Sequence, residues 1–496
     1  MHVRVAQRRG GHRLDRFDLL RAPIAGAFLR WRHARTALQS LLLATAVILV
    51  LHGLLGNQDA PANLATVLSW VHYRGLLVLT LLAAGNFFCT GCPIVLVRNL
   101  GRRLRAPSRR WPRALRGKWI PLALFVAVLF AYELFDLWGA PAATAWIVVA
   151  YFAVALAVDL VFSGASFCQY VCPIGQFNFT ASALSPLEIQ IREPETCGTC
   201  RTADCVRGRH DVAVPARLVQ RGCELGLFLP SKVGNVDCTF CLECVHACPH
   251  DNVALAARVP GAELLDTGRR SGIGRLLQRP DIAAFVVVFA FAGLVNAFAM
   301  TDPAHAVEMW LMDAMHVTTE APVLAALFVI ALAGAPLVLL GGATTLTPGW
   351  RRTGWLRTAM AYAYALVPFG LGMWLAHYGF HLLTGVFRIV PVAQSAALEL
   401  AGWPVLGLPR WQWSGMRPGS VYPIEVGFIL LGTLGSLGLA YLISERDRPR
   451  RPLLSTVPWA AAIIVMAAAA LWILSQPMAM RGMGMGMMDM GLGMGG

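Results

Sequence analysis

The sequence is dominated by long apolar runs. Of its 496 residues, 57% are hydrophobic and only 14% are charged, whereas a soluble domain carries about 25% charged residues. About 20 consecutive apolar residues cross the hydrocarbon layer of a membrane. The chain contains nine such runs, which predict an all-α polytopic membrane bundle of about nine transmembrane helices. The runs cover residues 37–56, 64–87, 119–138, 142–163, 281–300, 321–341, 358–383, 425–444 and 455–475.

Basic residues gather in the short loops beside these runs. The loop from Arg98 to Lys118 holds nine basic residues and no acidic one. The net charge of +15 therefore follows the positive-inside distribution of membrane proteins and does not indicate nucleic-acid binding. This distribution predicts a bacterial inner-membrane protein with its N-terminus in the cytoplasm and, after nine spans, its C-terminus outside. No cleavable signal peptide is expected, because the first 35 residues are arginine-rich and lack an apolar core.

A dense cysteine motif lies between the fourth and fifth runs. Residues 238–249 read Cys-Thr-Phe-Cys-Leu-Glu-Cys-Val-His-Ala-Cys-Pro, the C-x2-C-x2-C-x3-C-P spacing of bacterial ferredoxins. Three thiolates on one tight loop can bind three corners of a cubane iron–sulfur cluster. The fourth, turned away by the proline, serves a neighbouring cluster. The spacing favours iron–sulfur ligation over the alternative, a zinc knuckle.

A looser set of cysteines precedes this motif. Cys205 follows Cys200 after a longer gap than usual, and no proline follows Cys223. In ferredoxins with two clusters, the fourth cysteine of each motif binds the cluster of the other motif. This exchange predicts two sets of four thiols, and therefore two 4Fe-4S clusters. The first set is Cys197, Cys200, Cys205 and Cys248, and the second is Cys238, Cys241, Cys244 and Cys223. The alternative is one cluster beside a degenerate or zinc-bound remnant.

The other four of the twelve cysteines form an internal repeat. Run two ends in Cys89-Thr-Gly-Cys92-Pro, and run four ends in Cys168-Gln-Tyr-Val-Cys172-Pro. Both pairs are expected at the cytoplasmic end of a helical hairpin, where they can meet across the bundle. Together they are candidates for binding a metal or cluster or for acting as redox thiols, and the alternative is inert thiols at helix ends. A reducing compartment favours these roles over disulfides.

These features resemble the NosR/NapH/CcoG group of membrane polyferredoxins. The resemblance rests on the two Cys-Pro pairs and the ferredoxin motif after them, and it covers roughly residues 37–280. It implies electron transfer through the inner membrane, often in support of a copper enzyme or a periplasmic reductase. The chain departs from the group in four ways. Its N-terminus is a short basic segment where NosR has an outer flavin-binding domain, and its first pair is C-x2-C-P where relatives often have x3. Its first ferredoxin motif is irregular, and its last five runs have no counterpart that we can name.

Histidines gather in the part of the chain predicted to face outward. His377 and His381 lie one turn apart on one helical face, while His52 and His72 flank the first outer loop. Imidazole binds haem iron, copper or zinc and carries protons. These four histidines are therefore candidate haem or copper ligands, His377 and His381 first. The alternative is interfacial histidines that hydrogen-bond lipid or backbone.

The Met/Gly-rich tail adds soft donors. It contains Met483, Met485, Met487 and Met488 spaced among glycines, and thioethers select Cu(I). The tail is therefore a candidate copper contact, with a merely disordered segment as the alternative. In the third run, Glu133 can relay protons, lie near a quinone or pair with an arginine such as Arg74.

Five segments summarise the predicted organisation. They are a basic cytoplasmic N-terminal segment (1–36), four transmembrane helices with two Cys-Pro pairs (37–163), a cytoplasmic ferredoxin-like α+β iron–sulfur domain (164–279), five transmembrane helices (280–475) and the Met/Gly-rich outer tail (476–496).

The predicted function is electron transfer between a cytoplasmic or quinone donor and a membrane or outer-face acceptor, by a redox carrier rather than a stand-alone enzyme. Its partners are donor and acceptor proteins or quinone, and the lipid bilayer. Copper, haem or quinone is the candidate for a further centre. Copper reduction or assembly of a cuproenzyme is the first alternative, and a membrane scaffold with structural clusters is the second.

Overall fold

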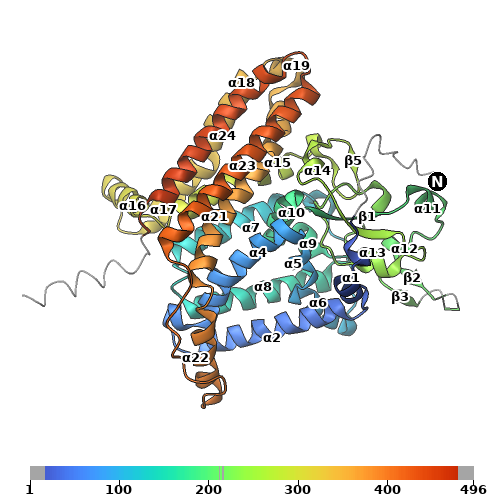
Figure 1. Ribbon diagram of the computed structural model, residues 1–496, viewed down its shortest axis with the longest axis horizontal. Helices are drawn as coiled ribbons and strands as arrows, with labels where there is room; N and C mark the ends of the chain where they lie inside the picture. Colours follow the sequence, from blue (N-terminus) through green and yellow to red (C-terminus); the bar gives the residue numbers. More distant parts are fainter. Residues whose placement is uncertain (1–16, 212, 215–216, 479–496) are drawn as a thin grey trace, which may run out of the picture. The chain divides into compact units, whose positions relative to one another are not determined.

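The computed structural model describes residues 17–211, 213–214 and 217–478, which are mainly helical (Figure 1). The predicted tail ligands Met483, Met485, Met487 and Met488 lie outside these residues. Within the described chain, eight helices are long and apolar enough to cross a membrane, so the protein is of the multi-pass membrane type. These helices are α2 (Ala34–Leu55), Leu64–Ala84 with α3 (Leu64–Thr66) and α4 (Arg74–Ala84), α8 (Pro141–Val161), α15 (Pro280–Phe298), Glu320–Leu346 with α17 (Glu320–Val329) and α18 (Ala335–Leu346), Trp355–Gly385 with α20 (Trp355–Ala363) and α21 (Val367–Gly385), α23 (Pro418–Asp447) and α24 (Pro452–Ser475).

The third predicted run differs from the other eight. It forms α7 (Trp119–Leu134), a helix of 16 residues that spans about 24 Å, less than the hydrocarbon thickness of about 30 Å. It ends early because Asp136 takes a left-handed backbone conformation, φ 45°, which a right-handed helix does not accommodate. The predicted nine long spans are thus corrected to eight long helices and this shorter one in the described chain. Two unpredicted helices, α16 (Asp302–Ala314) and α22 (Ile389–Ala401), form in expected loops.

The chain folds into two compact units, each assembled from stretches far apart in sequence. Unit 1 comprises Met1–Ala46, Leu79–Leu122 and Tyr151–Ala283. Unit 2 comprises Val47–Val78, Ala123–Ala150 and Ala284–Gly496. All twelve cysteines belong to unit 1, whereas His52, His72, His377 and His381 belong to unit 2.

Unit 1 contains the cysteine-rich segment and many short elements. Its sheets are three antiparallel pairs, β1 with β4, β2 with β3 and β5 with β6, and the longest ladder runs from Leu187 opposite Ala257 to Ile191 opposite Val253. Residues 164–279 thus contain short helices and strands. The elements are α1 (Pro23–Arg30), α5 (Phe87–Thr90), α6 (Pro93–Leu104), α9 (Ser166–Tyr170), α10 (Pro173–Ala181), β1 (Leu187–Ile191), α11 (Pro194–Thr199), α12 (Asp204–Arg207), β2 (Arg209–His210), β3 (Leu218–Gln220), α13 (Glu243–Ala247), β4 (Val253–Ala257), α14 (Ala262–Leu265), β5 (Arg269–Arg270) and β6 (Gly274–Arg275).

An apolar core fixes the cysteine loop of unit 1. Leu29 of α1, Phe179 of α10, Ile189 of β1 and Leu255 of β4 pack in one cluster with Phe240, which is fully buried between two loop cysteines. Burying such side chains stabilises the fold by about 1.5–3 kcal/mol each. The loop is therefore held by its neighbours although it has little regular structure of its own.

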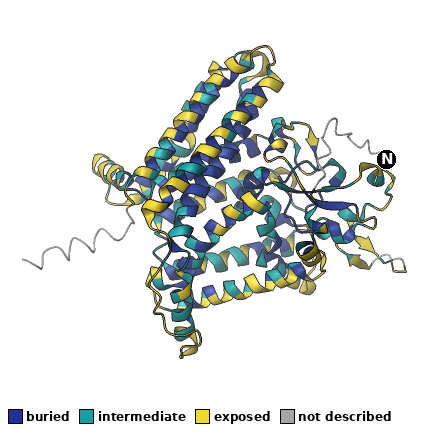
Figure 2. Cartoon of the chain, in the orientation of Figure 1, coloured by how far each residue is buried: buried dark blue, intermediate teal, exposed yellow. Residues whose placement is uncertain are grey.

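Unit 2 is a helical bundle in which α21 is buried along most of its length (Figure 2). Glycines let α21 and α23 approach closely. A Cβ atom at Gly372 would lie 2.6 Å from the Phe428 carbonyl oxygen, and one at Gly432 would lie 2.6 Å from that of Pro368. Small residues serve the same purpose at many helix contacts within membranes. The indole of Trp374 also donates to the Phe289 carbonyl at 2.9 Å, which ties α21 to α15.

Candidate functional site

The structure brings three buried loop cysteines close to the partly buried Cys223, and these four are here called the 238–244 group (Cys223, Cys238, Cys241 and Cys244). Burial raises the pKa of the Cys244 thiol, and the neighbouring thiols of Cys241, Cys223 and Cys238 raise it further. The loop curls tightly because Phe240 and Leu242 adopt left-handed conformations, with φ of 51° and 59°. Three thiols of one loop thus lie beside Cys223, the partner that ligand exchange predicts.

A second set, the 197–205 group, contains Cys197, Cys200, Cys205 and Cys248. Burial raises the pKa of Cys205 to about 12, and its neighbours Cys248, Cys197 and Cys200 contribute to the rise. Asn252 connects two of these thiols, because its side-chain amide donates to Cys197 Sγ at 3.3 Å and its backbone N–H donates to Cys248 Sγ at 3.4 Å. The Cys248 sulfur atom is therefore joined through Asn252 to Cys197, while the backbone N–H of Cys248 still bonds to the Cys244 carbonyl of its own motif at 3.2 Å.

The four remaining cysteines form a third set, the Cys-Pro group (Cys89, Cys92, Cys168 and Cys172). Three of them, Cys92, Cys168 and Cys172, pack against one apolar cluster. Burial raises the pKa of Cys89, and the nearby thiols of Cys92 and Cys172 raise it further. The two pairs, which are 76 residues apart between Cys92 and Cys168 in sequence, meet as the repeat predicted.

Each Cys-Pro dipeptide marks the start of a helix. Cys92 is the N-cap of α6 and Cys172 is the N-cap of α10, and a proline follows each as the first helical residue. Proline favours this position because its fixed φ suits a helix and its missing N–H is not needed there. The partial positive charge of a helix N-terminus stabilises a thiolate. Proline after cysteine is therefore the sequence signal for these two caps.

Polar groups surround the sulfur atoms of the Cys-Pro group. The hydroxyl of Tyr151 lies 2.7 Å from Cys172 Sγ, to which the backbone N–H of Gly175 donates at 3.0 Å. The side-chain amide of Asn178 donates to Cys89 Sγ at 3.3 Å. Hydrogen bonds of this kind tune the potential of thiolate-bound iron centres. Tyr151 and Asn178 could not be recognised as donors from the sequence, because the fold brings each to its sulfur atom, whereas Gly175 follows Cys172 at the start of α10.

Two buried arginines carry positive charge into the region of the thiols. Arg35 forms ion pairs of 2.9 Å with Glu224 and 2.8 Å with Glu243, and Arg98 forms one of 3.0 Å with Glu224. Against the effect of burial, the two guanidinium groups hold the pKa of Glu224 well below its usual range. Arg35 also opposes the burial effect on the pKa of Cys241.

The loop of the 238–244 group is bonded directly to the segment that bears Cys89. Thr90 donates through its hydroxyl to the Phe240 carbonyl at 2.7 Å, and Asn86 donates through its amide to the Cys238 carbonyl at 2.9 Å. These two bonds join two thiol groups of unit 1. Cys205 of the 197–205 group adds to the rise in the pKa of Cys244, so the 197–205 group also lies near the 238–244 group.

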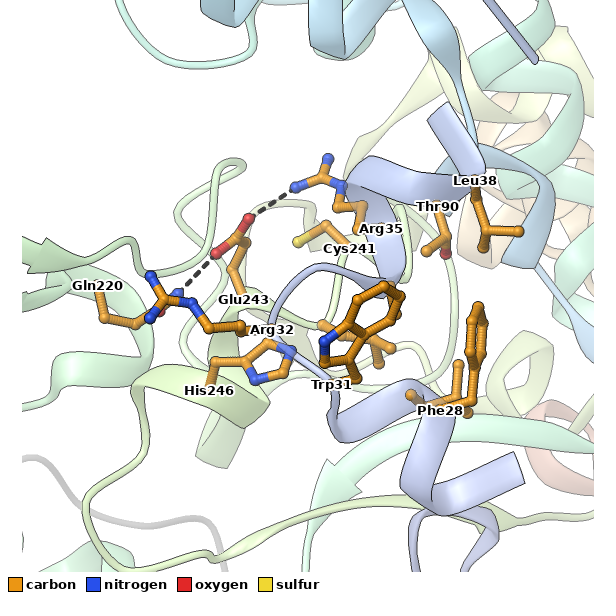
Figure 3. A pocket seen from close by; sticks show the side chains of 13 residues that line it. Phe28, Trp31, Arg32, Arg35, Leu38, Thr90, Gln220, Cys241, Glu243 and His246 are labelled. Carbon is orange, nitrogen blue, oxygen red and sulfur yellow. Dashed lines mark hydrogen bonds and ion pairs between the residues drawn. The ribbon is translucent and has the colours of Figure 1, made fainter. Parts of the chain in front are cut away.

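A cavity of about 40 Å³ reaches Cys241 and is bordered by Phe28, Trp31, Arg35 and His246 (Figure 3). Figure 3 shows Glu243 between Arg35 and Gln220, and the Gln220 amide donates to Glu243 at 2.8 Å. Trp31 is 49% exposed at its rim. The cavity is large enough for water alone, so it brings solvent close to one thiol of the 238–244 group.

The predicted histidines divide into two kinds. His72 has both ring nitrogens at hydrogen-bonding distance from backbone carbonyls, those of Val67 at 3.1 Å and Val386 at 3.0 Å. His52 accepts from the Leu64 N–H at 3.0 Å and lies 3.3 Å from a Glu399 carboxylate oxygen. Both rings are therefore hydrogen-bonded within the protein, which agrees better with the alternative to metal binding, namely histidines that hydrogen-bond the backbone. His377 and His381 instead line a large cavity of unit 2.

Glu133 of α7 has an amide as a neighbour, because Asn296 donates to its carboxylate at 3.2 Å. Arg74 lies against aromatic rings, with its guanidinium carbon 5.0 Å from the centroids of Trp70 and Tyr132. Its side chain donates to the Tyr132 hydroxyl at 3.2 Å. Aromatic faces attract such a cation.

No group of three or more His, Cys, Asp or Glu side chains among the described residues is arranged around a single metal ion. One ion draws its ligands to about 2.0–2.3 Å, whereas a cubane distributes four thiolates over its iron atoms. The thiol groups therefore lack the geometry of a mononuclear site. Comparisons with family models, curated proteins and solved structures found no significant match to this chain.

Proposed function

We propose that this chain is a membrane-bound electron-transfer protein whose unit 1 holds two 4Fe-4S clusters, one on the 238–244 group and one on the 197–205 group. One observation carries the proposal. Cys223 lies among the neighbouring thiols of Cys244, and Asn252 donates hydrogen bonds to the sulfur atoms of both Cys197 and Cys248, so each motif has beside it the fourth cysteine that ligand exchange assigns to it; Cys205 also lies near Cys223 and Cys244. When bound, the clusters would supply one-electron oxidation and reduction.

The donor chemistry of unit 1 fits such anionic groups. Arg35 Nε and Arg98 Nε and Nη1 are buried and have no hydrogen-bonding acceptor among the described residues. Buried charges are costly unless they are paired. These guanidinium groups have ion pairs with Glu224, Glu243 and, at 3.7 Å from Arg98, Asp159. A thiolate-bound cluster would offer sulfur acceptors to the N–H groups that these carboxylates leave without a hydrogen bond. The backbone N–H of Leu227, 3.4 Å from Cys223 Sγ, offers a further donor to sulfur.

The Cys-Pro group is proposed as a third thiolate-bound redox centre. Its four thiols converge at the start of α6 and α10, and the bonds from Asn86 and Thr90 attach it to the 238–244 group. The three groups thus follow one another through unit 1. By the positive-inside rule, we infer that unit 1 lies toward the cytoplasm of a bacterial inner membrane.

Anaerobic purification with iron and acid-labile sulfide analysis and EPR tests the proposal. Two clusters would give about eight iron atoms per chain. Cys244→Ser and Cys205→Ser should each remove the signal of one cluster, and Cys89→Ser combined with Cys172→Ser should leave both signals. Protein that holds no iron under these conditions would refute the proposal.

A further inference from the structure

Unit 2 contains a cavity of about 810 Å³ that several aromatic side chains line. Trp70, Tyr132, Trp138, Phe380 and Tyr422 supply rings, and the helices that bear these residues include α21 and α23. The volume lies in the range of pockets that bury small organic ligands, about 300–1,000 Å³. Since the walls are apolar and belong to membrane-type helices, the cavity suits a lipid-soluble ring system.

Two imidazoles, those of His377 and His381, belong to residues that line this cavity. His377 is 2% exposed, and its ring centroid lies 5.0 Å from that of His381 at an interplanar angle of 83°. The Nε2 atoms of both rings are buried and have no hydrogen-bonding partner among the described residues. A buried polar atom without a partner costs about 1–3 kcal/mol, so two such atoms on residues that line a cavity favour a ligand that can reach and satisfy them.

Other polar groups line the same cavity. Arg74 is held by the rings of Trp70, Tyr132 and Tyr378, with its guanidinium carbon 4.6 Å from the Tyr378 centroid. Glu425 of α23 is 5% exposed and also lines the cavity. The cavity therefore offers hydrogen-bonding groups from α4, α21 and α23 between aromatic surfaces.

We propose that this cavity binds the head group of a membrane quinone. A quinone is a flat, apolar ring with an oxygen at each of two opposite ends, and it fits between aromatic rings. Neutral imidazole donates from one nitrogen and accepts at the other, depending on its tautomer. His377 and His381 can thus donate to a quinone carbonyl or accept from a quinol hydroxyl. The proposal concerns binding and stands without the iron–sulfur assignment.

Two other ligands fit the cavity less well. Histidines four residues apart project from the same face of one helix, so they cannot ligate a haem from its two opposite faces. A copper ion bound by His377, His381 and Glu425 would need a three-ligand arrangement, and the described residues contain no such group. An acyl chain would leave both Nε2 atoms unsatisfied.

The test is a titration of the detergent-solubilised full-length protein with decylubiquinone and, in a second arm, menadione. Binding is followed through tryptophan fluorescence, because Trp70 and Trp138 line the cavity and quinones quench indole emission. Saturable quenching by either quinone is expected. Quenching by neither would overturn the proposal, as would saturable Cu(I) binding that His381→Leu abolishes while quinone quenching stays unchanged.

Variants separate hydrogen bonding from packing. His381→Leu should weaken quinone binding about tenfold, and His381→Gln, which retains a polar group, should lose less. Ser414→Trp fills space on the cavity wall and should reduce binding with both histidines intact. The matched control is His316→Leu at an exposed position, which should bind as the unaltered protein does. Thermal unfolding of each variant checks its fold. Equal affinities for all four variants would contradict the proposal.

Discussion

The thiol groups of unit 1 and the cavity of unit 2 are built in opposite ways. The thiols lie on short helices, caps and loops, and most of their neighbours are cysteines a few residues away in the same motif. The cavity is formed by long helices, and its lining comes from positions as far apart as Ala60 and Met478. The spacing of cysteines in the sequence therefore predicts the thiol groups, whereas the cavity can be found only from the packed helices.

The two sites also differ in how they treat charge. In unit 1, buried arginines are paired with carboxylates, and Glu224 serves both Arg35 and Arg98. In unit 2, Arg74 is surrounded by aromatic rings. A carboxylate network suits a region that holds anionic thiolates, while an aromatic enclosure keeps a cation in apolar surroundings. The comparison can be tested by disturbing one unit and measuring both.

The largest expected effect comes from removing iron. Metal binding to a site that the unfolded chain lacks contributes its free energy to folding. Anaerobic chelation should therefore make residues 194–257 accessible to trypsin while the segment Trp355–Gly385 stays protected. Limited proteolysis with mass spectrometry measures both segments, and decylubiquinone quenching reports on unit 2. Equal protection of residues 194–257 with and without iron would contradict a structural contribution from clusters.

The membrane helices were the most predictable part of the fold. Hydropathy alone located all eight long helices to within several residues, because each must cover the hydrocarbon with apolar side chains. It did not foresee the early end of α7, which depends on the backbone conformation of Asp136. It also missed α16 and α22, whose polar or short sequences resemble loops.

The candidate sites were predictable to different degrees. Cysteine spacing predicted the neighbours of Cys223 and Cys248, because ligand exchange is a local geometric rule. Arg98 was interpreted only as part of a basic loop, and its contact with Glu224 joins residues 126 positions apart in sequence. Similarly, His72 and His381 looked alike in sequence, although of these two only His381 has an Nε2 atom without a hydrogen-bonding partner among the described residues. Long-range pairing decides such cases.

The next largest effect is expected from the carboxylate shared by two arginines. Glu224→Ala leaves Arg35 and Arg98 buried without it, and breaking a buried ion pair costs about 3–5 kcal/mol. Denaturant titration measures the free energy of unfolding. The control is Asp447→Ala, which removes the partner of Arg446 in a pair whose side chains are each 29% exposed, at a cost of about 0–1 kcal/mol. Similar losses of unfolding free energy in the two variants would show that the ion pairs of Glu224 contribute no more than an exposed pair does.

A smaller effect is expected where α21 and α23 meet in unit 2. Gly432→Ala places a methyl group 2.6 Å from the Pro368 carbonyl oxygen, and overpacking of this kind costs about 1–3 kcal/mol. Gly438→Ala in the same helix is the matched control, since no described atom lies within 4 Å of its added Cβ. That variant should be stabilised by about 0.5–1 kcal/mol, because alanine favours a helix. Thermal unfolding of both variants measures these effects. An unchanged iron content in both variants would show that the substitutions leave unit 1 unaltered.

The smallest effect concerns one hydrogen bond in the Cys-Pro group of the iron-free protein. Burial raises the pKa of Cys172 to about 12, while the Tyr151 hydroxyl and the Gly175 N–H oppose the rise. Tyr151→Phe removes the first donor, so the pKa rises further and less thiolate is present at pH 9. Alkylation of Cys172 should slow about fivefold, which corresponds to a hydrogen bond of about 1 kcal/mol, and quantitative mass spectrometry of the labelled peptide measures it. In the unaltered protein and in Tyr151→Phe alike, the alkylation rate of Cys172 should increase with pH up to the pKa of its thiol.

Tyr441→Phe in α23 is the control and should leave the alkylation rate unchanged. An unaltered rate in Tyr151→Phe would mean that the phenol does not stabilise the thiolate, and the Cys-Pro sulfur atoms would then depend on backbone and amide donors alone.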